Sequence, residues 1–591
     1  MSKTFGSRTR LRFLLVVVVV IFAVIFARLI YLHVWKQEKL IGIIERNRQK
    51  FDVIHSCRGN VVDKRGNLLA TTRSVIELGV DPQMIREEDR DKWQDLARLT
   101  KLNIKDIERV FTEKFRKVRD GDGFEEVKQI RWHRLVADME EGIYEKVVKL
   151  NIKGVYGNRK YERIYPQRSL AAHVIGFVNK EGSAVTGVEH SMDFYLNGQD
   201  GWRETERDGH RRELAQFRTR EVDSENGLNV ELTIDIMVQH AIEQEIARFV
   251  KEYTPKAATI IVSEPITGYI LGLANYPSFD PNEFWKYDVG VHKNRAVTDV
   301  YEPGSPFKAV TASSVLNESL MNLTEQYDCS MDRISYQGRI VRLPKDHRPF
   351  HILSGRDVIK KSSNRGVAQM AMKLDNEKYY EYIKLFGFGE KTGFGYGEVT
   401  GKVHRVKDWD GLTISRLPMG HAIDCTPMQM HCAMSVIATG GVLMQPQIVK
   451  RIFNETGETI VDFAPRAKRR VISEETAELM AEVLSEVVGP EGTSKQAFIC
   501  GYNVAGKSGT SQKIIRGRYS NQHHISSFSG FFPADNPRLQ ITVIIDEAKI
   551  GRCAYGGVVA APVSCNIGES LIQCLNIQPS DVTTNLVACK H

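Results

Sequence analysis

The sequence lacks the patterns that identify metalloproteins and nucleic-acid-binding proteins. Its nine cysteines contain no Cys-x-x-Cys pair and no metal-ligand spacing, so we expect neither a metal site nor a cofactor. Lysine and arginine are scattered rather than interleaved with aromatic residues, and the net charge of +8 is modest for 591 residues. We therefore expect no nucleic-acid partner. Disulfide pairing stays open: Cys553 or Cys565 could pair in an oxidising compartment, and buried free thiols fit equally well.

One long apolar run stands near the N-terminus. Residues 13–27 are uninterrupted apolar sequence, and four basic residues precede them: Lys3, Arg8, Arg10 and Arg12. The run is shorter than the roughly 20 residues of a membrane-spanning helix, but a snorkelling Arg28 would extend it to Val34. No small-x-small cleavage site follows, which favours an uncleaved anchor over a signal peptide. We predict a cytoplasmic tail (1–12), a single transmembrane anchor (13–34) and an extracytoplasmic remainder, because basic flanks stay in the cytoplasm.

After the anchor, the first large part of the chain carries no recognisable chemistry. Residues 36–225 mix strands with charged helices, and residues 58–70 look like a strand, a glycine turn and a second strand. Dense charge from Arg203 to Arg220 indicates solvated strands or a linker. We interpret this part as a pedestal and docking module.

Residues 226–575 have the pattern of an α+β domain, and residues 576–591 form a C-terminal tail. Apolar alternation over 230–234 precedes a helical stripe at 236–250. Further strands are expected at 258–262, 269–273, 504–513, 526–532 and 539–546, with a last helix at 560–575. This order predicts an antiparallel sheet covered by helices, to which the first and last elements both contribute.

Ser305 is the strongest catalytic candidate. It lies three residues before Lys308, so both side chains would share one face of a helix. Pro306 suits the first helical position, which would place Ser305 at the N-terminus, where unpaired N–H groups favour developing negative charge. Ser-x-x-Lys is common by chance, however, and an N-cap serine beside a solvated lysine is the simpler interpretation.

Two later segments change that balance. Ser362-Ser363-Asn364 supplies Ser-x-Asn, and Lys507-Ser508-Gly509-Thr510 supplies Lys-Ser-Gly-Thr, 57 and 202 residues after Ser305. With Ser-x-x-Lys, these motifs form the active-site set of β-lactamases and penicillin-binding proteins. Each motif is weak alone, but the three in this order indicate one cleft in one catalytic domain.

The chain as a whole resembles a class B penicillin-binding protein, a monofunctional peptidoglycan D,D-transpeptidase, and is most similar to the cell-division type. The resemblance also covers pedestal and C-terminal segments: Arg58 to Ala70, Tyr165-Pro166, Ala172 to Phe177, Gly187-Val188-Glu189, Asn294 to Asp299 and Tyr555 to Pro562. Three departures occur: Pro306 where threonine is frequent, Ser508 in the lysine triplet, and Met419-Gly420-His421 where Gly-Gln-Gly is usual.

The resemblance implies an enzyme of the bacterial cytoplasmic membrane. It would cross-link stem peptides ending in D-alanyl-D-alanine through a serine acyl-enzyme during septal cell-wall synthesis, and β-lactams would acylate it. The implied partners are a polytopic SEDS-type glycan polymerase and other division proteins. An elongation-type transpeptidase, a D,D-carboxypeptidase of the same fold, and a non-catalytic β-lactam-binding scaffold or sensor are the alternatives.

Residue chemistry and the resemblance together suggest roles within the site. We expect Lys308 to be the base for acylation, with a pKa lowered by burial and by the charge of Lys507. Ser362 would relay a proton to the departing amine, and Asn364 would hold Lys308 and the substrate amide. Lys507, Ser508 and Thr510 would hold the donor carboxylate, and Gly509 would let the strand approach a peptide edge-on. The backbone N–H groups of Ser305 and Thr510 would form the oxyanion hole.

Three other patterns favour structural interpretations. Asp346-His347 could suggest a serine triad, but a polar loop near the cleft is the favoured prediction. Gly387-Phe388-Gly389 and Gly393-Phe394-Gly395 lack the strand and helix context of a nucleotide loop, so they are predicted to be a helix stop and a turn. His523-His524 lacks metal-ligand partners and is predicted to lie in a surface loop.

Overall fold

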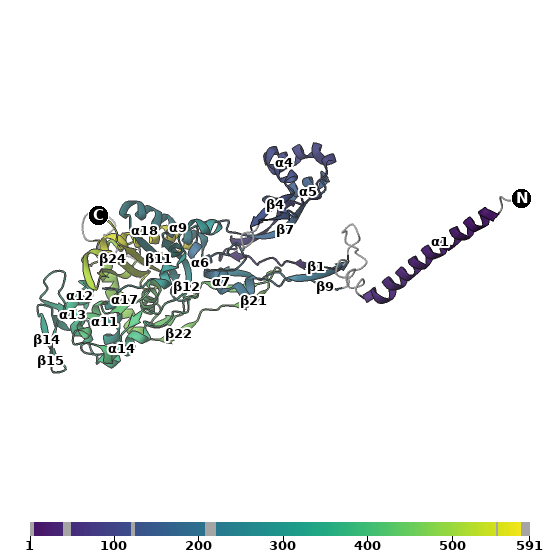
Figure 1. The fold of residues 1–591 in the computed structure, drawn as a ribbon. Coiled ribbons are helices and arrows are strands. Elements are labelled where there is room, and N and C mark those ends of the chain that lie inside the picture. The colour runs from purple at the N-terminus through teal and green to yellow at the C-terminus, as the bar shows by residue number, and fades with distance from the viewer. Residues whose placement is uncertain (1–4, 39–48, 120–124, 207–219, 551–553, 581–591) are drawn as a thin grey trace. The chain divides into compact units, whose positions relative to one another are not determined.

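The computed structural model describes residues 5–38, 49–119, 125–206, 220–550 and 554–580. It combines helices with mainly antiparallel sheets, which confirms the predicted α+β class (Figure 1). The chain forms two compact units, and both are discontinuous in sequence: Met1–Cys57 with Asn197–Gly227, and Arg58–Leu196 with Leu228–His591.

The first unit contains the apolar N-terminal helix. Helix α1 (Phe5–Ile30) continues into a π-helical turn, η1 (Tyr31–Trp35), and from Leu11 onward its large apolar side chains are exposed. The stretch Arg10–Trp35 is long and apolar enough to cross a membrane. The exposed helix therefore suggests a membrane anchor where the sequence predicts one.

A small antiparallel sheet completes the first unit. Its strands lie in the order β1 (Gln49–Ile54), β8 (Gly201–Glu206) and β9 (Arg220–Val222). The last two strands flank the charged segment that was predicted to be solvated strands or a linker. Residues 207–219 of that segment lie outside the described residues.

The pedestal part of the second unit combines β-strands with short helices. The predicted strand, turn and strand are confirmed by β2 (Val61–Val62) and β3 (Leu68–Val80), which pair antiparallel around Gly66 at a φ of +84°. The further strands are β4 (Phe115–Arg119), β5 (Glu125–Gln129), β6 (His133–Met139) and β7 (Val155–Ile164). Helices α3 (Trp93–Thr100), α4 (Ile104–Thr112) and α5 (Glu141–Lys149) enclose a separate small core.

A buried ionic network holds the pedestal segments together. The side chain of Glu189 is fully buried, and its two oxygens accept from Arg58 Nε and Arg163 Nε, each at 2.7 Å. Arg58 also donates to Asp193 at 2.6 Å, and Arg163 NH1 donates to the carbonyl of Gly59 at 2.7 Å. The carboxylate of Glu189 therefore joins two of the segments that resemble the family, Arg58 to Ala70 and Gly187 to Glu189.

Replacing Glu189 with alanine should destabilise the fold strongly. Arg163 would stay buried without its counter-charge, and Arg58 would keep only Asp193. Breaking a buried ion pair in this way typically costs about 3–5 kcal/mol. The matched control is Glu162→Ala, which breaks an exposed pair with Arg73 and should cost less than about 1 kcal/mol. Urea unfolding of the full chain in detergent, followed by tryptophan fluorescence, measures both. Equal effects of the two substitutions would contradict the importance given to this network.

A five-stranded antiparallel sheet forms the centre of residues 226–575, the predicted catalytic region. Its strands lie in the order β12 (Tyr269–Tyr276), β11 (Ala257–Glu264), β25 (Leu539–Asp546), β24 (Arg518–Phe532) and β23 (Ala505–Ile515). Successive residues face opposite sides, so Ile260 and Val262 enter one hydrophobic cluster and Ile261 enters the other. The strands predicted at 258–262 and 269–273 pair with each other, and the three late strands are also confirmed.

Helices cover both faces of this sheet. Helix α9 (Ile236–Tyr253) and helix α18 (Gly556–Leu575) pack on one face, and helix α16 (Pro427–Ala438) packs on the other. Helix α18 is also long and apolar enough to span a membrane, but it is partly buried in this core. Its apolar side chains are therefore explained by the sheet that they cover.

The strand at the start of the catalytic region departs from the prediction. Strand β10 (Asn229–Leu232) does not join the five-stranded sheet. It pairs in parallel with β2 and antiparallel with β20 (Val449–Phe453), which pairs in turn with β21 (Thr459–Asp462). The expectation that the first strand contributes to the catalytic sheet is therefore wrong. Alternation of apolar residues predicts a strand but does not specify its partner.

The turn after β2 is tied to the first helix of the catalytic region. Asp63, fully buried, accepts at one carboxylate oxygen from the backbone N–H groups of Arg65 and Asn67. Its other oxygen accepts from the backbone N–H of Ile236, the first residue of α9, at 3.0 Å. Asp235, the N-cap of α9, accepts in turn from Arg65. The pedestal turn thus satisfies the first N–H group of the helix, and Asp235 satisfies that of Met237.

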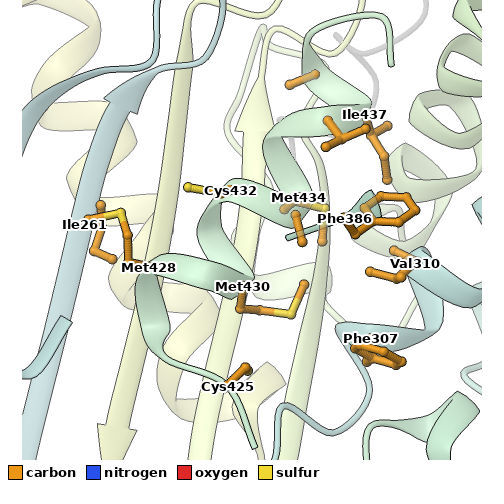
Figure 2. Packing of buried hydrophobic residues seen from close by; sticks show 14 of the residues in the cluster. Ile261, Phe307, Val310, Phe386, Cys425, Met428, Met430, Cys432, Met434 and Ile437 are labelled. Atoms are coloured by element: carbon orange, nitrogen blue, oxygen red, sulfur yellow. The ribbon is translucent and has the colours of Figure 1, made fainter. Parts of the chain in front are cut away.

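Helix α11 (Phe307–Asn317) lies in the largest core cluster. Figure 2 shows Phe307 and Val310 of α11 beside Met430, Met434 and Phe386. Every residue from Phe307 to Leu316 is buried, so the helix is surrounded by protein on all sides. Such burial fixes the position of the residues at its N-terminus.

Candidate active site

The Ser305 loop ends in a tight turn at the start of α11. Gly304 has a φ of +63°, a left-handed conformation that glycine adopts without strain. Pro306 is the N-cap with helical dihedrals, and the amide of Phe307 donates to the carbonyl of Gly304 at 3.0 Å. The helix begins one residue later than predicted, and Ser305 stands at its N-terminus.

Lys308 connects the first motif to the second. Its side chain is buried at 1% exposure, and Nζ donates to Asn364 Oδ1 and to the carbonyl of Ser362, both at 2.6 Å. Nζ also lies 3.1 Å from Ser362 Oγ, which lies 3.2 Å from Ser305 Oγ. A continuous hydrogen-bonded path therefore runs from Lys308 through Ser362 to Ser305.

The two adjacent serines of the second motif have different structural roles. Ser362 has a φ of +58°, a left-handed conformation that costs a non-glycine residue on the order of 1–3 kcal/mol. Ser363 is the N-cap of α13 (Asn364–Ala371), where its Oγ accepts from Gly366 N at 3.0 Å. The carboxylate of Asp346 accepts from Ser363 Oγ at 2.9 Å and from the backbone N–H of Asn364. These contacts hold Ser362 where it reaches Ser305.

The third motif lies on β23, at the edge of the five-stranded sheet. Lys507 is buried at 1% exposure, and its Nζ contacts Thr493 Oγ1 at 3.4 Å. Ser494 Oγ accepts from the backbone N–H of Ser508 at 3.1 Å and lies 2.8 Å from Ser508 Oγ. The loop before β23 therefore positions both motif side chains.

Gly509 and Thr510 join β23 to the Ser305 loop and to α18. A Cβ atom on Gly509 would lie 2.4 Å from Pro306 Cδ and 2.6 Å from Ser527 Oγ, so no side chain fits. Thr510 Oγ1 accepts from the backbone N–H of Gly556 at 2.9 Å. The Pro306 ring, a departure from the family's pattern, thus packs directly on the glycine of the third motif.

Burial makes both lysines unusual bases. The pKa of Lys308 is held well below its ordinary value by burial and by the positive charge of Lys507, against a smaller opposing effect of Asp346. Burial also lowers the pKa of Lys507 to about 7. A neutral Lys308 amine can therefore exist near neutral pH, as a general base requires.

The predicted site residues come together at one cleft of about 450 Å³. Seven of them line it: Ser305, Ser362, Asn364, Lys507, Ser508, Gly509 and Thr510. Lys308 lies beneath, in contact with Ser362 and Asn364. A serine hydroxyl connected to a buried amine, beside an edge strand, can carry out nucleophilic acyl transfer on a peptide.

Sequence reasoning missed residues that act through these motifs. Thr493 and Ser494 stand before β23, and the only signal for them is the Gly-Thr-Ser run that starts at Gly492. Glu302 lies 2.9 Å from His421 Nδ1 and accepts from Tyr519 OH at 3.1 Å. His421, from the Met419-Gly420-His421 departure, lines the cleft. No local pattern in the sequence indicated this contact.

The remaining sequence candidates lie where structural roles explain them. His347 lines the cleft and Asp346 supports the second motif, so the predicted polar loop near the cleft is confirmed. Helix α14 (Asn376–Leu385) ends before the first glycine pair, as predicted. His523 and His524 lie on strand β24 rather than in a loop. Cys565 is a free thiol and Cys500 is disulfide-bonded, while Cys553 lies outside the described residues.

Comparison with known proteins agrees with this geometry. Residues 258–569 match the model of the penicillin binding protein transpeptidase domain, and residues 53–232 match that of the penicillin-binding protein dimerisation domain. The chain is 31% identical over 576 residues to stage V sporulation protein D of Bacillus subtilis (strain 168), covering 97% of this chain and 86% of that protein. It is 26% identical over 568 residues to peptidoglycan D,D-transpeptidase FtsI of Escherichia coli (strain K12), covering 95% and 91%.

Solved structures share the fold. Penicillin binding protein 3 from Mycobacterium tuberculosis, complexed with aztreonam, is 26% identical with a TM-score of 0.65, covering 90% of this chain and 98% of that one. Penicillin Binding Protein 2X from Streptococcus thermophilus has a TM-score of 0.73 at 21% identity, over 89% of this chain and 80% of that one. Both family models and the near full-length relatives thus lead to one conclusion: the chain belongs to the class B penicillin-binding proteins and is a serine-type peptidoglycan D,D-transpeptidase.

Proposed function

We propose that this transpeptidase works at the division septum and that Ser305 carries the acyl group. The hydrogen-bonded path from Lys308 through Ser362 to Ser305 supports the chemical part of the proposal. Similarity to the protein named FtsI along nearly the whole chain supports the septal part. The donor is a stem peptide that ends in D-alanyl-D-alanine, and a β-lactam acylates the same serine.

Acylation begins with attack of Ser305 Oγ on the carbonyl carbon between the two terminal D-alanines. The hydroxyl proton moves through Ser362 to neutral Lys308 as the new C–O bond forms. The Lys308 ammonium returns that proton through Ser362 to the amide nitrogen, the C–N bond breaks, and the terminal D-alanine leaves. Asn364 orients Lys308 through Oδ1, and one hydrogen of its Nδ2 is available for the substrate amide.

Strand β23 supplies donor recognition. Its outer edge allows the donor peptide to bind as an added strand, and Lys507, Ser508 and Thr510 hold the terminal carboxylate. The backbone N–H groups of Ser305 and Thr510 stabilise the oxyanion, with about 2.7–4 kcal/mol expected for one such donor. Thr493 and Ser494 keep the motif side chains in position.

Transfer reverses these steps with a second stem peptide. The acceptor amine attacks the ester carbonyl and gives its proton to Lys308 by way of Ser362. The ester C–O bond then breaks, Ser305 Oγ recovers a proton, and the new amide bond is the cross-link.

The septal role also assigns functions to the rest of the chain. We place the anchor at 13–34, the pedestal at 36–225 and the catalytic domain at 226–575, with tails at 1–12 and 576–591. The chain crosses the membrane once, with the N-terminus in the cytoplasm and the catalytic domain outside. The anchor and pedestal bind a polytopic SEDS-type glycan polymerase and other division proteins, and this tethering raises the effective concentration of the partner.

Replacing residues 13–34 with an unrelated membrane span tests this assignment. β-Lactam labelling should be unchanged, because the cleft is untouched, whereas septal recruitment and activation of the polymerase should fall. Fluorescence microscopy of a labelled fusion, with the unaltered span as control, measures recruitment. If the exchanged chain supports division as well as the original, the anchor is only a tether. Recruitment of the original chain to the side wall would instead favour an elongation-type enzyme.

A further inference from the structure

An exposed basic segment adjoins the active site. The basic arm, residues 333–348, comprises β14 (Arg333–Tyr336), β15 (Arg339–Arg342) and the loop that follows them. Figure 1 shows the two strands projecting from the catalytic region, at the lower left of the view. The arm carries five exposed cations: Arg333, Arg339, Arg342, Lys345 and Arg348. In the part of the chain that the structure describes, none of them forms an ion pair. Its one acid, Asp346, faces Ser363 and Asn364 instead.

The arrangement of these cations costs stability. Arg333 and Arg342 lie directly opposite each other across the hairpin, a like-charge pairing that destabilises two strands. Arg342 also approaches Arg416, from helix α15 (Thr413–Arg416), and the pKa of Arg416 is lowered by burial and then by Arg342. The NH1 group of Arg416 is buried without a hydrogen-bond partner. Asp410 and Tyr519 oppose these effects on Arg416, but they leave its pKa lowered. A local arrangement that breaks stability rules is expected where a ligand binds.

The arm is attached to the cleft wall that holds the second motif. Asn364 Nδ2 donates to the carbonyl of Lys345 at 2.8 Å, and His347 itself lines the cleft. The pKa of His347 is lowered by burial and then by the charges of Arg348 and Lys308. The loop that carries Lys345 and Arg348 therefore stands beside the Ser-x-Asn wall, and the hairpin cations extend outward from it. The donor carboxylate is assigned to β23 on the other wall.

We propose that the basic arm and Arg416 bind the carboxylates of the acceptor stem peptide as it enters the cleft. This inference rests on the proposed transfer reaction, in which a second, anionic peptide must reach the Ser305 ester while the donor still occupies the β23 side. Cations at the entrance raise the local concentration of an anion and lose this effect as salt increases. Arg416 contributes a buried N–H group that has no hydrogen-bond partner within the described residues.

Binding of an acceptor to the acyl-enzyme tests the proposal directly. The full chain in detergent is first acylated with benzylpenicillin, and a fluorescent stem peptide with free carboxylates is then titrated by anisotropy. The triple variant Arg333→Gln, Arg342→Gln, Arg348→Gln should raise the Kd about tenfold or more and flatten its salt dependence. The matched control is Lys251→Gln, Lys391→Gln, Lys407→Gln, which removes the same charge elsewhere and should leave the Kd unchanged.

Further measurements distinguish the possible outcomes. A stem peptide with amidated carboxylates should bind the original chain as weakly as the free peptide binds the arm variant. Penicillin acylation should be equal in the original chain, the arm variant and the control variant. A failure of Ser305 to acylate would therefore contradict the proposed function, and it would leave the proposal about the basic arm unaffected. An unchanged Kd in the arm variant would overturn the proposal. Binding of the peptide to the unacylated enzyme alone would also overturn the proposal, because the basic arm would then recognise the donor and not the acceptor.

Discussion

Ser305→Ala should lose all covalent labelling by a fluorescent penicillin. The strained amide of a β-lactam lies beside a carboxylate, so it would occupy the cleft as the donor peptide does. The attacking atom is Ser305 Oγ, and alanine has no atom to form the ester. Thermal unfolding should stay nearly unchanged, because the substitution removes one hydroxyl at the cleft surface and leaves helix α11 intact.

Gel fluorescence after labelling, followed by peptide mapping, measures this effect. The matched control is Ser485→Ala on helix α17 (Glu474–Val488), where the hydroxyl donates to Glu482 away from the cleft. The control should label like the original chain. Label retained by Ser305→Ala, or mapped to another peptide, would remove Ser305 from the mechanism.

Lys308→Ala should lower the rate of acylation by at least two to three orders of magnitude. General-base assistance is typically worth about 10²–10⁴ in rate, and Lys308 is the buried amine connected to Ser305 through Ser362. Lys361→Ala is the matched control, because that lysine neighbours Ser362 in sequence but pairs with Asp357. Stopped-flow acylation rates compare the variants. A near-original rate in Lys308→Ala would assign the base to Ser362 or to water.

The same experiment has a pH dependence with a definite sign. Acylation should rise with pH as Lys308 loses its proton, well below the ordinary lysine range, because burial and Lys507 lower its pKa. It should fall again as Lys507, with a pKa of about 7, loses the charge that attracts the donor carboxylate. Lys507→Ala should move the rising limb to higher pH, because the pKa of Lys308 rises without its cationic neighbour. A rising limb that does not move would contradict this coupling.

Sequence patterns predicted the elements better than their pairing. Periodicity located helix α9 and the strands β11, β12 and β25 to within a few residues, since buried faces impose a repeat of 3.6 or 2. Strand β10 was recognised but assigned to the wrong sheet. Its partners β2 and β20 lie far away in sequence, and no local pattern specifies a long-range pairing.

The same distinction applies to the site. Residues that react fall into short motifs, so Ser305, Lys308 and Lys507 could be found from spacing. Residues that hold the motifs in place act through tertiary contacts: Asp346 caps the second motif, and Ser494 bonds the third. Their residue types occur on any polar loop, so only the folded structure distinguishes them. The like-charge pair of Arg333 and Arg342 could not be predicted from the sequence either, because it depends on the register of a hairpin.

The sheet that contains β10 makes the pedestal difficult to exchange. The order β21-β20-β10-β2-β3-β6 runs without a break from strands late in the catalytic region to strands of the pedestal. Cutting the chain between 225 and 226 would expose an edge of β10 and remove the contact of Asp63 with the start of α9. The two regions therefore have no modular boundary at which evolution or an engineer can recombine them. A pedestal transplanted from another family member would need matching β10 and β20 strands to be inherited with it.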